Sequence, residues 1–370
     1  MDHNDWYSIS DVESLDSPAL VIYRERVKEN IRLLTGMIDD VSRLRPHVKT
    51  NKCVEAVQLM LDAGITKFKC ATIAEAEMLG MCKAPDALLA YQPAGPKLGR
   101  LIKLIKTYPD TKYSCLVDNI TSATNISETA VQNGLQIDVY IDLNVGQNRT
   151  GIIPGDALQL YIDCQSLDGI KLIGLHAYDG HLHEADLQAR TIACNLAYEP
   201  VAQLQREIVA KNLPEPIIVA GGSPTFPIHA KREKIECSPG TLIYWDRGYS
   251  IVCAEQPFSP AALVISRVIS LPDKTKVCLD VGHKSVSAEN DLSKRIYFIN
   301  APELKMISQS EEHLVCEAVE GHQYKVGDVL YGMPYHVCPT IALYERAITI
   351  ENHKITGEWK NIARDRKINI

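Results

Sequence analysis

The chain has 370 residues and a formal net charge of −7; hydrophobic residues make up 46% of it and charged residues 23%. This composition is ordinary for a soluble globular protein, and the acidic balance argues against nucleic acid as a partner, because phosphate backbones are bound by basic surfaces. No apolar run approaches the roughly 20 residues needed to span a bilayer, so no membrane association is expected.

The cysteines indicate a compartment. There are 11 of them, scattered along the chain without a Cys-x-x-Cys pair, and residues 1–18 are polar and acidic, unlike a signal peptide. Unclustered thiols are typical of reduced proteins, so we expect a cytoplasmic protein.

In chain order, short apolar runs alternate with amphipathic helical runs up to about residue 240. The predicted strands are RLRPHVK (43–49), KFKCAT (67–72), ALLAY (87–91), YSCLVD (113–118), QIDVYIDL (136–143), KLIGLHAY (171–178), PIIVAGG (216–222) and KIECSPG (234–240). The predicted helical runs are residues 24–38, 54–64, 96–109 and 184–212, and Pro200 is expected to break the last of these into two helices.

This alternation predicts an α/β fold with a parallel sheet covered by helices, and eight such units close into a (β/α)8 TIM-type barrel. A doubly wound open sheet is the alternative, which strand count alone does not exclude. After Asp246 the runs become strand-like and are separated by turns, which predicts a mainly-β domain. We therefore expect a barrel at residues 18–245 and a β domain at residues 246–370, with residues 1–17 joining the β domain.

Polar residues at the ends of the predicted strands are the first candidates for a site, because barrel enzymes place their active sites at the C-terminal ends of the strands. Lys49 ends the first predicted strand, Arg149 follows the fifth, and His176, Tyr178 and His181 end the sixth. A lysine in a barrel mouth is partly desolvated and near other cations, which frees its amine as a nucleophile. The simpler reading of Lys49 is a surface lysine at the start of a helix.

Two glycine-containing turns follow the last two predicted strands. They contain Gly221, Gly222, Ser223 and Thr225 after the seventh strand, and Gly240 and Thr241 after the eighth. Barrels often bind a phosphate between these two loops, where glycines allow close approach and hydroxyls donate. The glycines of each turn, taken alone, are explained by the need to reverse the chain. Found together after the last two strands, the two turns favour a phosphate site. A phosphate-bearing cofactor that needs a lysine is pyridoxal 5'-phosphate (PLP).

His336 and Cys338 form a third candidate site in the β domain. In an extended segment, side chains at i and i+2 point the same way, so an imidazole and a thiolate could bind one zinc ion and leave positions open for water or substrate. A His-x-Cys sequence is also common by chance.

Taken together, these motifs resemble one known family. They are SPALVIY (17–23), LRPHVKTNK (44–52), GITKFKCATIAEAEML (64–79), GLHAYDGH (174–181), PGT (239–241) and PYHVCPT (334–340). They look like the D-threonine aldolase and D-serine dehydratase-like family of fold type III PLP enzymes, which is more distantly related to alanine racemase. The similarity runs from about residue 17 to the C-terminus.

The resemblance implies roles for the candidate residues. Lys49 falls on the Schiff-base lysine, Arg149 on the arginine near the phenolic oxygen of the cofactor, and Tyr178 beside the pyridine ring. His336 and Cys338 fall on the ligands of a divalent metal, for which a thiolate and an imidazole favour zinc, with manganese as the alternative. The residues that fall in the phosphate-binding loops are Gly221, Gly222, Ser223, Gly240 and Thr241.

Three positions bear on how far the family pattern applies. Asn51 stands where the family often has histidine, and His176 stands where many members carry glutamine. Cys338 is more typical of the dehydratases, whereas the aldolases more typically have aspartate there.

The resemblance implies a PLP- and divalent-metal-dependent lyase that acts on a small 3-hydroxy-D-amino acid, by dehydration or by retro-aldol cleavage. It also implies a homodimer. Two alternatives remain: a PLP-dependent racemase, for which Tyr331 or Tyr335 would supply a second acid-base group, and a non-catalytic PLP carrier.

Overall fold

The computed structural model describes residues 5–370, which form two compact units. The barrel unit comprises Leu34–Lys49, Val57–Gly240 and Asp365–Ile370. The β unit comprises residues 5–33, Thr50–Ala56 and Thr241–Arg364. Residues 1–4 lie outside the described residues, and the domain boundary at residues 245 and 246 stays a prediction.

The barrel unit contains a parallel sheet in which strand order follows sequence order, from β2 to β8. Its strands are β2 (Lys67–Cys70), β3 (Asp86–Leu89), β4 (Lys112–Val117), β5 (Ile137–Asp142), β6 (Ile170–Ala177), β7 (Ile217–Ala220) and β8 (Ile235–Cys237). The inward-facing residues Leu88, Leu116, Tyr140 and Val219 pack together in the sheet's core. The predicted α/β barrel class is confirmed.

The first predicted strand differs from the prediction. Residues 43–49 form no continuous strand. Arg43 ends the short turn η2 (Val41–Arg43), and the residues after it contribute single parallel bridges, Leu44 to Cys237 of β8 and His47 to Lys69 of β2. Pro46 lies between the bridges and has no N–H to donate, so a continuous ladder cannot form. The segment nevertheless lies between β8 and β2 and completes the ring of strands.

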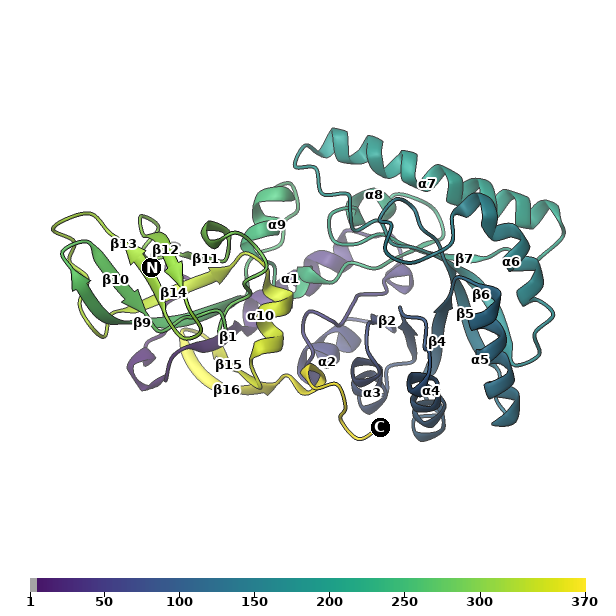
Figure 1. The fold of residues 1–370 in the computed structure, drawn as a ribbon, viewed down its shortest axis with the longest axis horizontal. Helices are drawn as coiled ribbons and strands as arrows, with labels where there is room; N and C mark the ends of the chain where they lie inside the picture. The colour runs from purple at the N-terminus through teal and green to yellow at the C-terminus, as the bar shows by residue number, and fades with distance from the viewer. Residues whose placement is uncertain (1–4) are drawn as a thin grey trace. The chain divides into compact units, whose positions relative to one another are not determined.

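Helices follow the strands, as the alternation predicted, and Figure 1 shows α3 to α6 packed along the outer side of the sheet. The helices of this unit are α3 (Ile73–Met81), α4 (Pro96–Thr107), α5 (Ile120–Gln132), α6 (Ala157–Cys164), α7 (Leu187–Ala210) and α8 (Phe226–His229), with a short η3 turn (Pro154–Asp156). Thr72, Asn119 and Asp186 cap the N-termini of α3, α5 and α7 with their side chains.

The break predicted at Pro200 is absent, because α7 runs unbroken from Leu187 to Ala210 with Pro200 inside it. Pro200 and Leu196 are both exposed. Water can therefore bond the Leu196 carbonyl, which would otherwise accept from the N–H that proline lacks.

The β unit is built on a nine-stranded sheet whose main path runs β12-β13-β10-β9-β1-β15-β16, while β14 pairs with β9 and β11. Its strands are β1 (Ala19–Tyr23), β9 (Ala262–Asp273), β10 (Lys276–Leu279), β11 (Ile296–Phe298), β12 (Lys305–Gln309), β13 (Leu314–Glu317), β14 (Val329–Pro334), β15 (Arg346–Glu351) and β16 (Lys354–Lys360). β1 comes from the N-terminal part of the chain and pairs with β9 and β15, and Ile9 and Leu15 pack in the same core.

Short helices connect the strands of the β unit. They are η1 (Val12–Ser14), η4 (Thr241–Ile243), α9 (Arg247–Val252), η5 (Leu292–Lys294), α10 (Val337–Leu343) and η6 (Ile362–Arg364). Two further helices, α1 (Arg24–Gly36) and α2 (Val54–Asp62), each contain one of the points at which the chain passes from one unit to the other.

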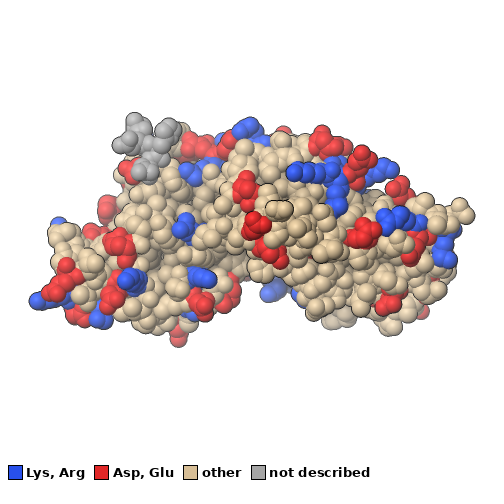
Figure 2. All heavy atoms as spheres, turned by 90° about the horizontal axis from the view of Figure 1, so that it is seen from above, with Lys and Arg blue, Asp and Glu red and all other residues tan. Residues whose placement is uncertain are grey.

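Surface charge is mixed on the face drawn in Figure 2, where acidic and basic side chains alternate over the surface instead of gathering by sign. Between residues 5 and 370, no helix has the length and apolar character that crossing a membrane requires.

Candidate active site

A cavity of about 640 Å³ opens at the C-terminal ends of β2 to β6, within the barrel unit. Its lining includes Lys49, Lys69, Arg149, His176 and Tyr178. This is the end of the barrel at which the sequence predicted the site.

Three of the predicted residues meet around one aromatic ring. Lys49 Nζ lies 5.7 Å from the centre of the Tyr178 ring, and Arg149 Cζ lies 5.4 Å from it. Lys49 is half-buried, and its backbone N–H donates to Nδ1 of buried His47 at 3.2 Å. The structure thus places an amine and a guanidinium beside the aromatic ring that the resemblance assigned to the cofactor.

The arginines that precede Lys49 are occupied elsewhere. Arg43 pairs with Asp39 and donates to the carbonyl of Ile235. Arg45 is buried and pairs with Glu236 at 2.7 Å and with Asp86. The expectation that other cations lie near the Lys49 amine is therefore not met by Arg43 and Arg45, since acidic partners neutralise both.

Lys69, which sequence reasoning missed, also reaches the cavity. It is buried on β2, with Nζ 5.1 Å from the centre of the Tyr178 ring and 3.5 Å from Nε2 of His176. Burial, together with the charge of Lys49, lowers the pKa of Lys69 to about 7. The available signal was a charged residue between the apolar residues Phe68 and Cys70 of a barrel strand.

His176 is held from its other side by a buried carboxylate. Nδ1 of His176 lies 2.8 Å from Oδ1 of Asp142, and Oδ2 of Asp142 accepts from Gln92 at 3.0 Å. Burial lowers the pKa of His176 despite the bond to Asp142. Burial alone would raise the pKa of Asp142, but its bonds to His176 and other donors lower it below the ordinary value. The pair therefore consists of a neutral imidazole and a charged carboxylate.

The Gly221–Gly222 turn follows β7, and a side chain would be strained at Gly221 and crowded at Gly222. Gly221 has φ +79°, and a Cβ added to it would lie 2.8 Å from Cδ2 of His229. A Cβ on Gly222 would lie 3.0 Å from Cε2 of Tyr178. The structure thus brings this glycine turn against the ring that lines the cavity.

The hydrogen bonds of this turn refine the phosphate prediction. The N–H groups of Gly221 and Gly222 already donate, to the Ala177 carbonyl and to Oγ1 of Thr225. The expectation that Thr225 offers its hydroxyl to a phosphate is wrong, since that buried hydroxyl donates to Asp179 at 2.7 Å. Ser223 lies next to the second loop, because its Oγ accepts from the Gly240 N–H at 3.2 Å, and buried Thr241 follows Gly240.

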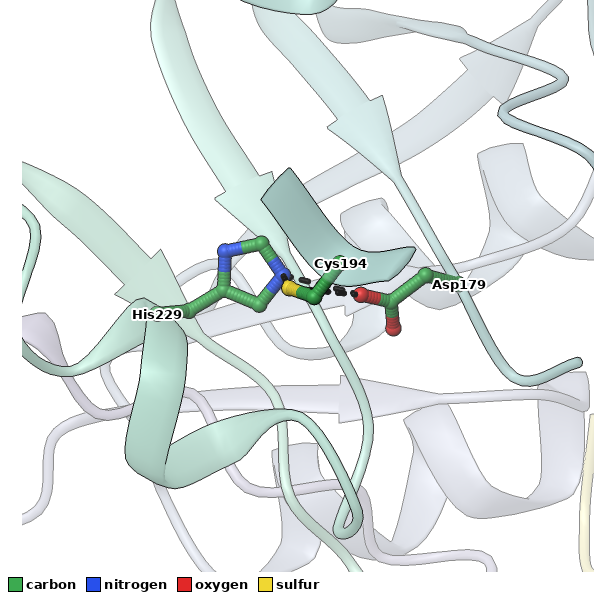
Figure 3. A group of neighbouring side chains, drawn as sticks. All are labelled: Asp179, Cys194 and His229. Atoms are coloured by element: carbon green, nitrogen blue, oxygen red, sulfur yellow. Dashed lines mark hydrogen bonds and ion pairs between the residues drawn. The ribbon is translucent and has the colours of Figure 1, made fainter. Parts of the chain in front are cut away.

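Behind the glycine turn lies a buried network centred on Asp179, the residue after Tyr178. His229 Nε2 lies 2.9 Å from Oδ2 of Asp179 and 3.3 Å from Sγ of Cys194, as Figure 3 shows. The three ligand-type atoms lie within 4.8 Å of one another. Because these groups and Thr225 already bond one another directly, the arrangement acts as a brace that joins the end of β6 to the turn after β7. The bond from His229 keeps the pKa of Asp179 low although burial opposes this, so the carboxylate stays charged.

His336 and Cys338 lie together in the β unit, but not in an extended segment as expected. His336 is the N-cap of α10, and Cys338 lies in the first turn of that helix. The helix begins here because Oδ2 of Asp246 accepts from the Val337 N–H at 3.0 Å and because Pro339 fits a first turn, where its missing N–H costs nothing.

The surroundings of this pair suit a metal. Nδ1 of His336 lies 2.5 Å from Oε1 of Glu289, and Sγ of Cys338 lies 3.1 Å from Oγ1 of Thr50. Although burial opposes it, the hydrogen bond to Cys338 and the charges of Cys338 and Asp246, together with the hydrogen bond to Glu289, raise the pKa of His336 to about 9. A histidine ligand normally has its second nitrogen bonded to a carboxylate, as here. Glu289 is 47 residues away in sequence, so no local signal revealed it.

Comparison with known proteins covers nearly the whole chain. The alanine racemase N-terminal domain family matches residues 22–248, and a serine dehydratase domain family matches residues 261–350. The chain is 29% identical to the D-threonine aldolase of Arthrobacter sp. over 95% of this chain and 93% of that one. It is 25% identical to the D-threo-3-hydroxyaspartate dehydratase of Delftia sp. over 90% of this chain and 93% of that one.

Solved structures share the fold. The crystal structure of D-threonine aldolase from Filomicrobium marinum superposes with a TM-score of 0.88 at 24% identity, over 95% of this chain and 97% of that one. In sequence, alanine racemase of Clostridium perfringens matches only 45% of this chain and 42% of its own length.

These matches confirm the predicted resemblance to lyases of the D-threonine aldolase and D-serine dehydratase type. Alanine racemase is only a distant, partial match in sequence. The family match at residues 22–248 covers more than half of the chain, and this chain therefore belongs to the alanine racemase N-terminal domain family.

Proposed function

We propose that the protein is a PLP- and divalent-metal-dependent lyase that acts on small 3-hydroxy-D-amino acids. The observation that carries this proposal is the convergence of Lys49, Arg149 and Tyr178 in one cavity at the C-terminal mouth of the barrel. Relatives that match over 90% or more of the chain are named as aldolases and dehydratases of such amino acids.

The residues present fit PLP. The cavity offers an amine on Lys49, an aromatic face on Tyr178 and a guanidinium on Arg149 for an anionic oxygen. The turn at Gly221 and Gly222 packs closely against Tyr178 and His229, which places the loop beside the aromatic ring of the cavity. Ser223, Gly240 and Thr241 complete the loops that we assign to the phosphate.

When bound, PLP supplies an aldehyde for an amine and a ring that accepts electrons from the substrate carbon. Lys49 would hold the cofactor through its Nζ, and the same Nζ, once free, would serve as the base for the α-carbon proton. Tyr178 would offer an aromatic face to the cofactor ring, and Arg149 would neutralise an anionic oxygen of the cofactor.

His336 and Cys338 are the residues that would hold the metal, with Glu289 fixing the imidazole. One nitrogen and one sulfur donor suit zinc better than magnesium or calcium, and manganese is the alternative. A divalent ion with open positions supplies a Lewis acid for a substrate hydroxyl. Cys338 favours dehydration over aldol cleavage, following the family pattern.

The racemase alternative requires a second acid-base group. Tyr331 is buried in the core of the β unit, where its OH accepts from the Ile9 N–H at 3.3 Å and its ring contacts that of Tyr7. That placement argues against Tyr331 in this role.

Assembly and compartment complete the proposal. We expect a homodimer, a small-molecule D-amino acid as substrate, and neither nucleic acid nor membrane as partner. The 11 cysteines are free thiols, which supports a cytoplasmic protein.

Turnover of pure protein tests the reaction directly. D-serine, D-threonine and 3-hydroxy-D-aspartate are supplied with and without a chelator, and the L-enantiomers serve as matched controls. We expect a 2-oxo acid and ammonia from a D-substrate, lost on chelation. Glycine and an aldehyde would indicate aldol cleavage, and racemisation that resists chelation would refute the lyase.

A further inference from the structure

Lys69 is a buried amine that the proposed reaction does not use. Its side chain lines the cavity and is 2% exposed. Its hydrogen-bond partner is Nε2 of His176 at 3.5 Å, and within residues 5–370 it forms no ion pair with a carboxylate. A buried cation without a counter-ion is costly, so this arrangement calls for an anion from outside the chain.

The charges around Lys69 point the same way. Lys49 and Arg149 lie beside the same Tyr178 ring. Asp142 and Asp179 act on Lys69 from a distance, but each already has a histidine partner, His176 and His229. Arg45 adds positive charge, although Glu236 and Asp86 largely neutralise it.

The hydrogen-bond directions leave donors for a ligand. Because Asp142 accepts from Nδ1 of neutral His176, Nε2 is the acceptor that faces Lys69. An ammonium group has three N–H donors, and this bond uses one of them. Two donors therefore remain for an anion in the cavity.

We propose that Lys69 is an anion-binding residue of the cavity, positioned by His176, and that it binds one oxyanion: the carboxylate of the amino-acid substrate or the phenolate oxygen of PLP. The choice between these sources rests on the proposed function, but the anion site itself does not. If the anion is the substrate carboxylate, the Lys69–His176 pair is a determinant of the substrate that this chain accepts.

The first experiment asks whether the anion is a carboxylate. Full-length protein freed of cofactor is titrated at pH 6.0 with sodium acetate or sodium D-lactate, against sodium chloride at equal ionic strength, and thermal unfolding is followed. We expect stabilisation by both carboxylates that Lys69→Met weakens at least tenfold. Lys103→Met, which removes an exposed lysine of α4, is the matched control and keeps the wild-type response.

The second experiment asks whether the anion is the phenolate. The same variants are loaded with PLP, and absorption is recorded from pH 6 to 9. If Lys69 holds the phenolate, Lys69→Met lowers PLP affinity at least tenfold and shifts the pH at which the absorption band changes, while Lys103→Met changes neither.

Two measurements guard against a variant that fails to fold. Lys69→Gln repeats both comparisons with a polar side chain. Wild-type protein, titrated without buffer at pH 7.5 with sodium D-lactate, should take up a fraction of a proton per chain, because a bound anion raises the pKa of Lys69 from about 7.

The outcomes are separable. Variants of Lys69 that bind lactate, acetate and PLP as Lys103→Met does, with no proton uptake by wild-type protein, would overturn the proposal. If the protein has no lyase activity but binds anions in a way that depends on Lys69, the proposed reaction is refuted and the anion site is retained.

Discussion

Nδ1 of His176 donates to Asp142 at 2.8 Å, and this single bond fixes which nitrogen of the imidazole meets Lys69. Both side chains are buried at the ends of neighbouring strands, β5 and β6. A charged carboxylate behind a neutral imidazole lets the imidazole accept from an amine, so Asp142 controls the hydrogen bonding of Lys69 without touching it.

Stability should depend on pH through Lys69. Its pKa is about 7 in the folded chain and 10.5 as an ordinary lysine, so the unfolded chain binds more protons between these values. Stability of the cofactor-free protein should therefore rise with pH across this window, by up to about 1.4 kcal/mol per pH unit. Urea unfolding of wild type and Lys69→Met at pH 6, 7.5 and 9 measures the contribution of Lys69 to the free energy of unfolding. We expect the variant to be more stable than wild type at pH 6 and the difference to shrink above pH 7. A difference that stays constant above pH 7 would contradict the prediction.

Lys49 should carry the cofactor covalently. Pure protein is expected to be yellow, with a band that borohydride bleaches, and peptide mapping should then find the reduced cofactor on Lys49. Lys49→Ala should lose both the covalent link and turnover, because alanine has no amine that can bond the cofactor aldehyde. Reduced cofactor on Lys52 or Lys69 would reject the assignment.

Asp179 should support cofactor binding from behind the glycine turn. Asp179→Ala leaves His229, Thr225 and Cys194 without their shared acceptor, and breaking such a buried charged network costs about 3–5 kcal/mol. We expect a lower urea midpoint and weaker PLP binding, with a smaller effect for Asp179→Asn. The exposed Asp110→Ala is the control and should change stability by no more than about 0.5 kcal/mol. Equal behaviour of the two alanine variants would show that the brace is unimportant.

The metal should depend on His336, Cys338 and Glu289. About one zinc per chain is expected, bound more weakly than at a four-ligand structural site. Cys338→Ala should abolish metal binding, and Glu289→Gln should weaken it about 10–100-fold by releasing the imidazole. Cys338→Asp should keep a metal but favour manganese.

Metal analysis of each variant checks this, with Cys82→Ala as a control cysteine outside the site. PLP should remain bound in every case, since separate residues hold it. Full lyase activity in metal-free protein would sink the metal-dependent mechanism.

Catalytically competent protein should have the mass of a homodimer with two-fold symmetry. Light scattering coupled to gel filtration measures this at the concentration used for turnover. A monomeric mass for active protein would contradict the prediction.

Periodicity and local motifs determined the fold class and part of the site. The alternation of strands and helices predicted the barrel, and barrel geometry placed Lys49 and Tyr178 at one mouth, because parallel strands end at the same edge. This reasoning failed at residues 43–49, because Pro46 has no N–H for a ladder and the segment forms two single bridges in place of a strand.

The tertiary structure alone decided which charges meet. The sequence could not show that Arg45 pairs with Glu236, 191 positions away, while Lys69 is left in the cavity with His176. It also could not show that Glu289 orients His336 or that Asp179 braces the glycine turn. Strand and helix periods specify which face of an element a side chain occupies, but the partner on the facing element depends on how distant segments pack, and that packing sets the desolvation and the charge of each group.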